Sequence, residues 1–397
     1  MKLSKRIISM QESPVRKLVP IATKVKKAGK KVYHLNIGQP DIETPKVFME
    51  AINNYDTKII KYSFSQGEPI LINAIRDYFN RDNILFEEDE ILITNGGSEA
   101  LTFAAISICD PGDEILVPEP FYTNYSGFTS GVNVSIKPIT TKAENGFHLP
   151  SKNDIIKLIT PKTKAFLFSN PGNPTGTIFT IDELKMITEI ANEYDLFIIS
   201  DEVYRGFAFD GLKGISMGSI KEAQERTIII ESVSKRYSAC GARIGSLSSK
   251  NKDLIKNILK LCQARLCVAT LEQIGAAALY KLDDDYTESV KDEYQARRDI
   301  VYKTLSEIPG VVCEKPTGAF YVVAKLPVEN AEDFIIWMLE EFEDNHETIM
   351  MAPAEGFYVT KGLGIDEVRI AYVLNTKDMQ RAMELLKKGL NQYNNKK

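Results

Sequence analysis

The sequence predicts an α/β protein whose main part is a mostly parallel sheet with helices on both faces. The first observation is a set of short, continuous apolar runs, typical of strands buried on both sides, at residues 90–94, 114–118, 164–169, 196–200 and 227–230. The second is that helix-like patterns alternate with these runs, as in repeated strand–helix units. The third is that the alternation stops near residue 250, which predicts a second, smaller α+β domain.

The length of the chain also favours two domains. Its 397 residues exceed what a single compact domain usually holds. We expect a large domain over residues 46–290 and a small domain formed by both termini, from residues 1–45 and 291–397.

The elements of the N-terminal region are predicted as follows. Residues 14–30 carry apolar side chains at helical intervals with lysines between them, which indicates an amphipathic helix. A short strand from residue 32 leads into a loop at Gly38, where a glycine lets another group approach the backbone closely. Residues 61–69 form a second loop before a helix. Residues 90–101 are a strand, a Gly-Gly turn and an alanine-rich helix whose first-turn N–H groups form a ready anion site.

Polar or turn-forming residues follow each of the next strands. Tyr122 follows the run at 114–118, an Asn/Pro/Gly-rich segment over 170–176 follows the run at 164–169, and Asp201 follows the run at 196–200. Because parallel strands end at the same edge of a sheet, these residues are expected to gather there. Beyond residue 250 we expect a further set of helices and strands. They are a long helical region over 251–305, a strand over 316–323, a helix over 331–342, a strand over 367–373 and a helix over 377–392.

Composition excludes several classes of protein. The net charge of −5, from 49 basic and 54 acidic residues, disfavours a nucleic-acid-binding surface. The five cysteines show neither a CxxC pair nor metal-ligand spacing, so we expect no metal site and a reducing compartment. Neither a signal-peptide pattern nor an apolar run of membrane-spanning length occurs. We therefore expect a cytoplasmic protein without a membrane or nucleic-acid partner.

The segment over residues 231–245 concentrates reactive side chains directly after a strand. It brings Ser232, Ser234, Lys235 and Arg243 to the carboxyl edge of the sheet, where α/β proteins bind ligands. An arginine donates paired hydrogen bonds to a phosphate, and a lysine with a depressed pKa forms a Schiff base with a carbonyl. Local residues alone leave an ordinary surface loop as an equal alternative.

Taken together, the motifs make the chain resemble the fold type I pyridoxal-phosphate enzymes, specifically the class I/II aminotransferases and their aspartate aminotransferase-like branch. The likeness covers nearly the whole chain. Its specific parts are Asn-Pro-Thr-Gly at 173–176, Asp-Glu-Val-Tyr at 201–204, Ser-x-Ser-Lys at 232–235, and Arg243.

The resemblance implies pyridoxal 5′-phosphate as the cofactor and assigns roles to residues. Lys235 would form the Schiff base with the cofactor aldehyde and then move protons as a base, while Asp201 would pair with the pyridine nitrogen. Asn173 and Tyr204 would hydrogen-bond the 3′-oxygen, and Tyr122 would stack on the ring. The phosphate ligands would be Gly97, Ser98, Glu99, Ser232, Ser234 and Arg243. In relatives a tyrosine matching Tyr62 reaches the neighbouring subunit's phosphate, which implies a homodimer with shared sites.

The substrate contacts are likewise implied by resemblance. Arg369 matches the arginine that binds the substrate α-carboxylate, and the Gly38 loop would close over that carboxylate, with Asn173 beside it. Arg265 departs from the family pattern, because relatives usually carry small polar residues and an Asn-Pro in this segment. We expect it to contact a distal carboxylate across the dimer, with an interface salt bridge as the alternative.

The expected activity is the transfer of an amino group from an L-amino acid, with aspartate as the leading donor, to a 2-oxo acid, with 2-oxoglutarate as the leading acceptor, by a ping-pong mechanism. A C–S β-lyase and an aromatic or neutral (kynurenine-type) aminotransferase remain alternatives on the same pocket. A cofactor-binding regulator would need a DNA-binding extension, and the chain has no room for one before residue 14. A purely structural protein is hard to reconcile with Lys235, Asp201 and Arg243 together.

Overall fold

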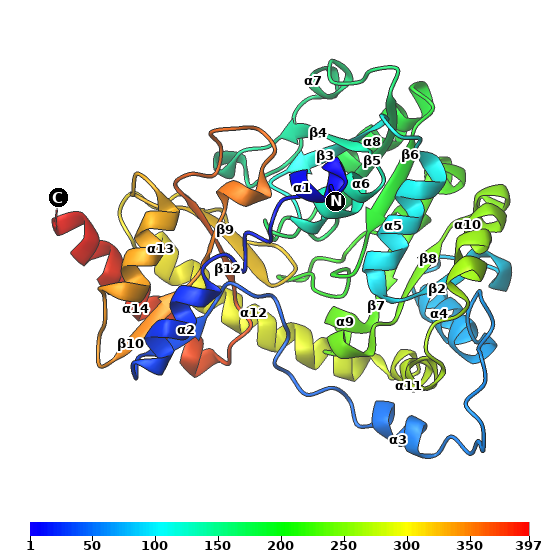
Figure 1. Cartoon of the computed structure of the whole chain (residues 1–397), viewed down its shortest axis with the longest axis horizontal. Helices are drawn as coiled ribbons and strands as arrows, with labels where there is room; N and C mark the ends of the chain where they lie inside the picture. The colour runs from blue at the N-terminus through cyan, green and yellow to red at the C-terminus, as the bar shows by residue number, and fades with distance from the viewer. Residues whose placement is uncertain (397) are drawn as a thin grey trace.

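The computed structural model of the chain describes residues 1–396 and is built around a seven-stranded sheet (Figure 1). The strand order is β2-β8-β7-β6-β5-β3-β4. All neighbouring pairs are parallel except those made by β8, which runs antiparallel to both β2 and β7. The strands, in spatial order, are β2 (Ile91–Thr94), β8 (Gly245–Ser248), β7 (Thr227–Ser232), β6 (Phe197–Asp201), β5 (Thr163–Ser169), β3 (Glu114–Glu119) and β4 (Ser135–Thr140).

Helices cover both faces of this sheet, as predicted. On one face, α5 (Gly96–Ile108), α6 (Asn124–Gly131) and α10 (Lys252–Arg265) share a buried apolar cluster with strand residues such as Val117 and Ile230. On the other face, α8 (Ile181–Glu193) packs on β5 and β6, while α4 (Pro69–Arg81) and α11 (Thr270–Tyr280) pack near β2 and β7. The sheet is therefore buried on both sides, which explains its continuous apolar strands.

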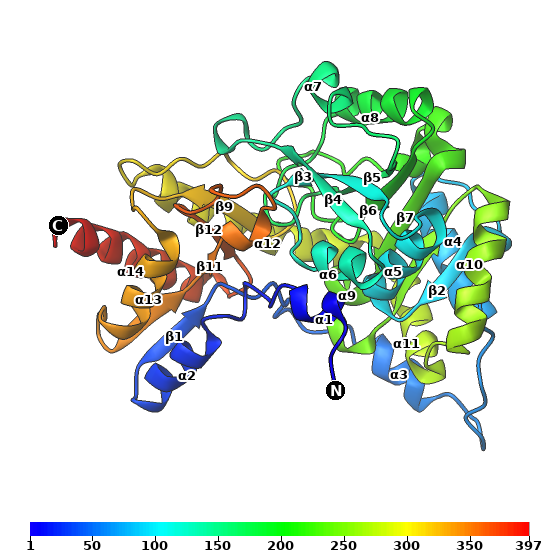
Figure 2. The same ribbon diagram turned by 45° about the horizontal axis from the view of Figure 1, so that its top comes forward.

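A second body of structure lies beside the large sheet (Figure 2). Here β1 (Lys31–His34) pairs in parallel with β10 (Glu347–Met350), and β11 (Ala352–Pro353), β12 (Glu367–Ala371) and β9 (Tyr321–Lys325) form an antiparallel sheet. Its apolar core joins residues of the N-terminal segment, such as Leu18 and Leu35, to residues of the C-terminal region. The helices of this part are α2 (Val19–Lys27), α12 (Asp284–Ser306), α13 (Ala331–Glu340) and α14 (Thr376–Asn395).

Four short α-helices complete the set of α-helices in residues 1–396. They are α1 (Lys5–Ser9), α3 (Val47–Asn53), α7 (Lys152–Ile156) and α9 (Val233–Arg236). Among residues 1–396, no helix combines the length and apolar character needed to cross a bilayer.

Several predicted boundaries were wrong. The helix expected over 14–30 begins only at Val19, because Pro20 lies in its first turn, where a residue without an N–H is tolerated. The region over 251–305 is three helices, α10, α11 and α12, rather than one long helical stretch. The chain leaves α10 at Leu266, whose φ of 81° is incompatible with a continuing helix. β4 and β8 were not predicted, since neither is a continuous apolar run.

Candidate active site

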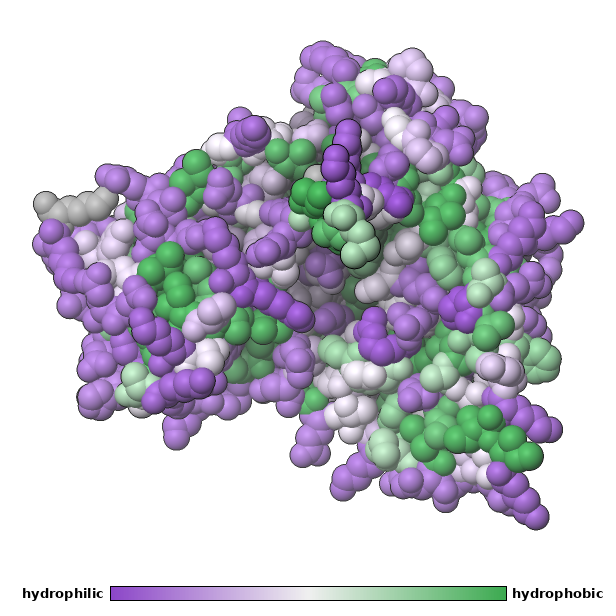
Figure 3. All heavy atoms as spheres, in the orientation of Figure 1, coloured by the Kyte–Doolittle hydropathy of each residue, from purple (hydrophilic) through white to green (hydrophobic). Residues whose placement is uncertain are grey.

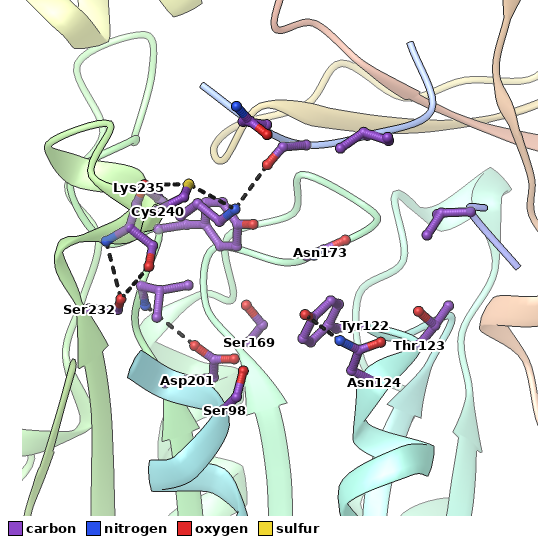
Figure 4. A pocket seen from close by; sticks show the side chains of 18 of the residues that line it. Ser98, Tyr122, Thr123, Asn124, Ser169, Asn173, Asp201, Ser232, Lys235 and Cys240 are labelled. Atoms are coloured by element: carbon purple, nitrogen blue, oxygen red, sulfur yellow. Dashed lines mark hydrogen bonds between the residues drawn. The ribbon is translucent and has the colours of Figure 1, made fainter. Parts of the chain in front are cut away.

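A cavity of about 410 Å³ opens where the strands of the large sheet meet the second body of structure. A hollow near the middle of the face drawn in Figure 3 lies in this region. In Figure 4, Lys235 and Cys240 stand on one side of the cavity, Tyr122 and Asn124 on the other, and Asp201 lies below. Twelve predicted residues line it: Gly38, Gly97, Ser98, Tyr122, Asn173, Asp201, Tyr204, Ser232, Ser234, Lys235, Arg243 and Arg369.

Lys235 projects into the cavity from the short helix α9. Ser232 caps this helix, because its Oγ accepts a hydrogen bond from the Ser234 N–H at 3.1 Å. The Lys235 Nζ donates to the Gly38 carbonyl oxygen at 2.9 Å, so the amine faces the loop that follows β1. A second contact of Nζ is to the Cys240 Sγ at 4.0 Å, so the amine is held between the end of β7 and the second body of structure at the wall of the cavity.

Asp201 ends β6 as a buried carboxylate. Its Oδ2 accepts a hydrogen bond from the Tyr125 hydroxyl at 2.8 Å, and burial raises the pKa of Asp201 to about 6. Within residues 1–396, no lysine or arginine forms an ion pair with it. A buried carboxylate of this kind is suited to a ligand that brings its own positive charge or N–H donor.

The start of α5 forms an anion-binding corner. The Asn95 side chain does not cap this helix, so it leaves the first-turn N–H groups of Gly97 and Ser98 without a side-chain cap. Arg243 lies against the same turn: a Cβ at Gly96 would come within 2.3 Å of its Nη2. A Cβ at Gly245 would come within 2.7 Å of the Gly97 nitrogen, so both glycines keep this corner open. Helix N–H groups plus an arginine are a phosphate site.

Arg369 lies on β12 and is buried without an acidic partner among the described residues. Its guanidinium lies between the rings of Tyr321, at 4.7 Å, and Phe357, at 5.0 Å. Nη1 donates to Asn173 Oδ1 at 3.3 Å and Nη2 donates to the Asn36 carbonyl oxygen, whereas Nε has no hydrogen-bond partner. Burial lowers the pKa of Arg369, and a bound carboxylate would restore the missing charge compensation.

The tyrosines of the cavity form a second polar group. Tyr204 and Tyr321 share a hydrogen bond of 2.9 Å between their hydroxyls. Tyr122 receives a hydrogen bond from Asn124 at 2.8 Å, and burial raises its pKa to about 12, so its hydroxyl stays protonated at neutral pH. These side chains can donate or accept hydrogen bonds but carry no charge.

Three predicted site residues do not line the cavity. Tyr62 is 82% exposed on the segment after α3. The Glu99 carboxylate turns back to accept from the Asn95 N–H at 2.8 Å and pairs with Arg265 Nε at 3.3 Å. Arg265 also donates to the Ile93 carbonyl oxygen at 3.1 Å, so it is bound within its own chain.

The structure also adds residues that the sequence did not reveal. Tyr125 holds Asp201, and Tyr321 lines the cavity beside Arg369. Tyr321 also explains Gly38, because a Cβ there would come within 1.7 Å of the Tyr321 hydroxyl. The glycine is required by this packing, a reason different from the substrate approach expected for it. The tyrosines at 125 and 321 lie outside the recognised motifs, and only the fold brings them to the site.

The chain is similar to known aminotransferases over nearly its whole length. The family model described as aminotransferase class I and II matches residues 30–386. Aspartate aminotransferase from Bacillus subtilis is 30% identical over 99% of this chain and 100% of its own length. Aromatic-amino-acid aminotransferase 2 from Thermococcus litoralis is 30% identical over 98% of each chain. The structure of alanine aminotransferase from Pyrococcus furiosus superposes with a TM-score of 0.90 at 32% identity, covering 98% of this chain and all of that one.

The chain belongs to the class I and II aminotransferases. It is an aminotransferase that depends on pyridoxal 5′-phosphate, as members of this family are. The residues of the cavity fit that cofactor: a buried carboxylate that forms no ion pair within residues 1–396, an anion-binding corner beside Arg243, and the amine of Lys235.

Proposed function

We propose that this aminotransferase moves the amino group of aspartate to 2-oxoglutarate by a ping-pong mechanism. The observation that carries the proposal is the charge of the cavity: of the residues that the structure describes, Lys235 and three arginines line it but a single carboxylate, Asp201. Such a site favours anionic substrates. The aspartate aminotransferases among its relatives support the choice of donor.

Each cavity residue has a proposed task. When bound, pyridoxal phosphate supplies a ring that accepts electrons from the substrate Cα. Lys235 would hold the cofactor through its aldehyde carbon, and its free Nζ would be the base that removes the proton from the substrate Cα and delivers it to the cofactor. Asp201 would keep the pyridine nitrogen protonated, and Tyr204 and Asn173 would donate hydrogen bonds to the 3′-oxygen.

Further residues orient cofactor and substrate. Tyr122 packs on the ring face. The phosphate is held by the amides of the α5 N-terminus together with Arg243, and the ligand set for it is Gly97, Ser98, Glu99 through its backbone N–H, Ser232 and Ser234. Arg369 binds the α-carboxylate with its free donors, and the Gly38 loop closes beside it.

The protein is also proposed to be a homodimer whose sites are shared. Apolar residues gather over α3 and the segment after it, at the lower right of Figure 3. They include Ile59 at 67% exposure, Ile60 at 62% and Phe64 at 57%, flanking Tyr62. Exposed apolar groups at this density are typical of protein interfaces. Burial against a second copy would bring Tyr62 of one subunit to the phosphate of the other.

For Arg265 we propose an internal role in place of the expected substrate contact. Its bonds to Glu99 and to the Ile93 carbonyl oxygen link the end of α10 to the first turn of α5 and the end of β2. The arginine therefore braces the helix that carries the phosphate corner from within its own chain, whereas the alternative expected for it was a salt bridge at the subunit interface.

The proposal also covers the division of the chain into two domains and the cellular compartment of the enzyme. We propose residues 46–290 as the cofactor-binding domain and residues 1–45 with 291–397 as the domain that closes over the substrate. The apolar core shared by both terminal regions supports this division. We place the enzyme in the cytoplasm.

The test is a steady-state panel of amino donors with 2-oxoglutarate as acceptor. Aspartate is expected to have the highest kcat/KM, with oxaloacetate as product. Higher values for alanine or aromatic amino acids, to which the alanine and aromatic-amino-acid relatives point, would overturn the choice of donor but not the reaction. Catalytic release of pyruvate and ammonia from a cysteine conjugate, without transamination, would establish the β-lyase alternative instead.

A further inference from the structure

The cavity contains one cation more than the proposed reaction has assigned. Arg243 faces the phosphate corner and Arg369 faces the α-carboxylate position. The third arginine that lines the cavity is Arg16, from the segment before α2. Among residues 1–396, Asp201 is the only carboxylate in the lining and lies at the end of β6, so Arg16 has no anion assigned to it.

The segment around Arg16 is bonded to the same backbone that positions Arg369. The Asn36 side-chain amide donates to the Val15 carbonyl oxygen at 2.9 Å. The carbonyl oxygen of Asn36 in turn accepts a hydrogen bond from the Arg369 guanidinium. Asn36 is fully buried, so this link is rigid and shielded from water. Arg16 therefore stands in a defined place relative to the α-carboxylate arginine.

Besides the hydrogen bond from Asn36, apolar packing holds the segment that precedes Arg16 in place. Val15 packs against the cluster that contains Phe357, and Phe357 lies 5.0 Å from the Arg369 guanidinium carbon. Pro14 rests on Gly356, where a Cβ would come within 2.3 Å of the proline ring. With both neighbours on its N-terminal side held in place, the Arg16 backbone has little freedom to leave the cavity mouth.

The side chain itself is available to a ligand. Among the residues that the structure describes, none makes an ion pair or hydrogen bond with the Arg16 guanidinium. The adjacent Lys17 differs, because its Nζ pairs with Glu332 at 2.6 Å and it does not line the cavity. The two neighbouring cations therefore differ: Lys17 is paired with Glu332, whereas Arg16 is exposed and lines the cavity.

We propose that Arg16 binds the distal carboxylate of dicarboxylic substrates and so determines specificity for them. This inference rests on the proposed function, since it supplies the contact that would make aspartate, glutamate and 2-oxoglutarate preferred over neutral substrates. The three arginines of the cavity then match three anionic groups: the cofactor phosphate, the α-carboxylate and the distal carboxylate. An arginine binds a carboxylate through two parallel N–H donors, which favours this pairing over a single-point contact.

The test measures binding rather than turnover. The ligands are succinate and butyrate, which have the same number of carbons and differ by one carboxylate, titrated calorimetrically into the cofactor-loaded protein. Arg16→Gln is expected to weaken succinate by roughly 10- to 100-fold, the range for a lost charge-assisted hydrogen bond. Butyrate should change less than about twofold. Arg16→Lys, which keeps the charge but loses the paired donors, should lie between.

Two further variants serve as controls. Lys17→Gln removes the neighbouring charge and is expected to leave both ligands unchanged. Arg265→Ala tests the other candidate for the distal carboxylate and should also leave the succinate-to-butyrate ratio unchanged. The cofactor absorbance and the thermal midpoint of each variant establish that it is folded and loaded.

The outcomes distinguish a failure of the role of Arg16 from a failure of the proposed dicarboxylate aminotransferase function. Wild-type protein that prefers succinate while Arg16→Gln leaves the preference intact would overturn the role of Arg16 alone. Equal weakening of both ligands by Arg16→Gln would also overturn it, because the loss would then be general. Wild-type protein that binds butyrate as tightly as succinate would overturn the dicarboxylate function itself.

Discussion

Replacing Asp201 by asparagine should stabilise the cofactor-free protein while abolishing its use as an enzyme. The carboxylate is buried, and its pKa of about 6 lies above the value of 3.8 taken for the unfolded chain. Folding therefore favours its protonated form, and the stability present at low pH is lost as the pH rises through about 4 to 6. At pH 8 the folded protein bears the full cost of the buried charge.

The size of the effect follows from the shift in pKa. A rise of about two units at about 1.36 kcal/mol each corresponds to about 3 kcal/mol at pH 8, of which about half remains at pH 5. For a chain of this size, that corresponds to a rise in the thermal midpoint of roughly 3 to 6 °C at pH 8. Scanning calorimetry on cofactor-free wild type and Asp201→Asn, at both pH values, measures it.

Asp210 offers a control, because its pKa is shifted in the direction opposite to that of Asp201. Its carboxylate pairs with Arg298 at 2.8 Å and Lys315 at 3.1 Å, and these cations lower its pKa. Asp210→Asn should therefore lower the midpoint at both pH 8 and pH 5, and the loss should shrink only as the pH falls below the pKa of the free carboxyl group toward the lowered pKa of the folded protein. The reasoning about Asp201 would be refuted if Asp201→Asn also lowered the midpoint at pH 8, because its charge would then be satisfied without a cofactor.

Three further changes probe the site. Lys235→Ala should reduce turnover by roughly 10²- to 10⁴-fold, and borohydride should no longer attach the cofactor to the protein, as mass spectrometry would show. Arg243→Leu should weaken cofactor binding by roughly 10- to 100-fold in an equilibrium titration, and unchanged affinity would remove it from the phosphate site. Gly38→Ala should lower both thermal midpoint and kcat/KM, because its Cβ collides with Tyr321, whereas Gly127→Ala has open space and should change neither.

The sequence predicts much of this site because the carboxyl ends of the buried strands can be recognised from the polar residues that follow apolar runs. Asp201 and Ser232 are the last residues of two strands whose continuous apolar sequences indicate burial on both faces. The last residues of parallel strands lie at the same edge of the sheet. The motifs around Lys235 and Asn173 then identify the family. These inferences need only local pattern and strand order, and the structure places all four of these residues at one cavity.

The rest of the site depends on contacts that no local pattern encodes. Tyr321 forms a hydrogen bond with Tyr204, which lies 117 positions earlier in the sequence. Arg16 lies at the cavity because the Asn36 side chain binds the carbonyl oxygen of the preceding residue, Val15. For Arg265 the sequence pattern is misleading. Because it is unusual for its segment, the residue was expected to bind the substrate, yet its charge is paired with Glu99 of the same chain. Burial and pairing decide the role of a charged residue, and both require the three-dimensional fold.

The most direct test of the central claim is a half-reaction with aspartate alone. Cofactor-loaded protein is mixed with excess aspartate and no oxo acid, and the oxaloacetate, the ammonia and the cofactor absorbance are followed together. The account predicts one equivalent of oxaloacetate per subunit, no ammonia, and restoration of the starting spectrum when 2-oxoglutarate is added. Continuous product formation with release of ammonia, or no spectral change with any dicarboxylic amino acid, would contradict it.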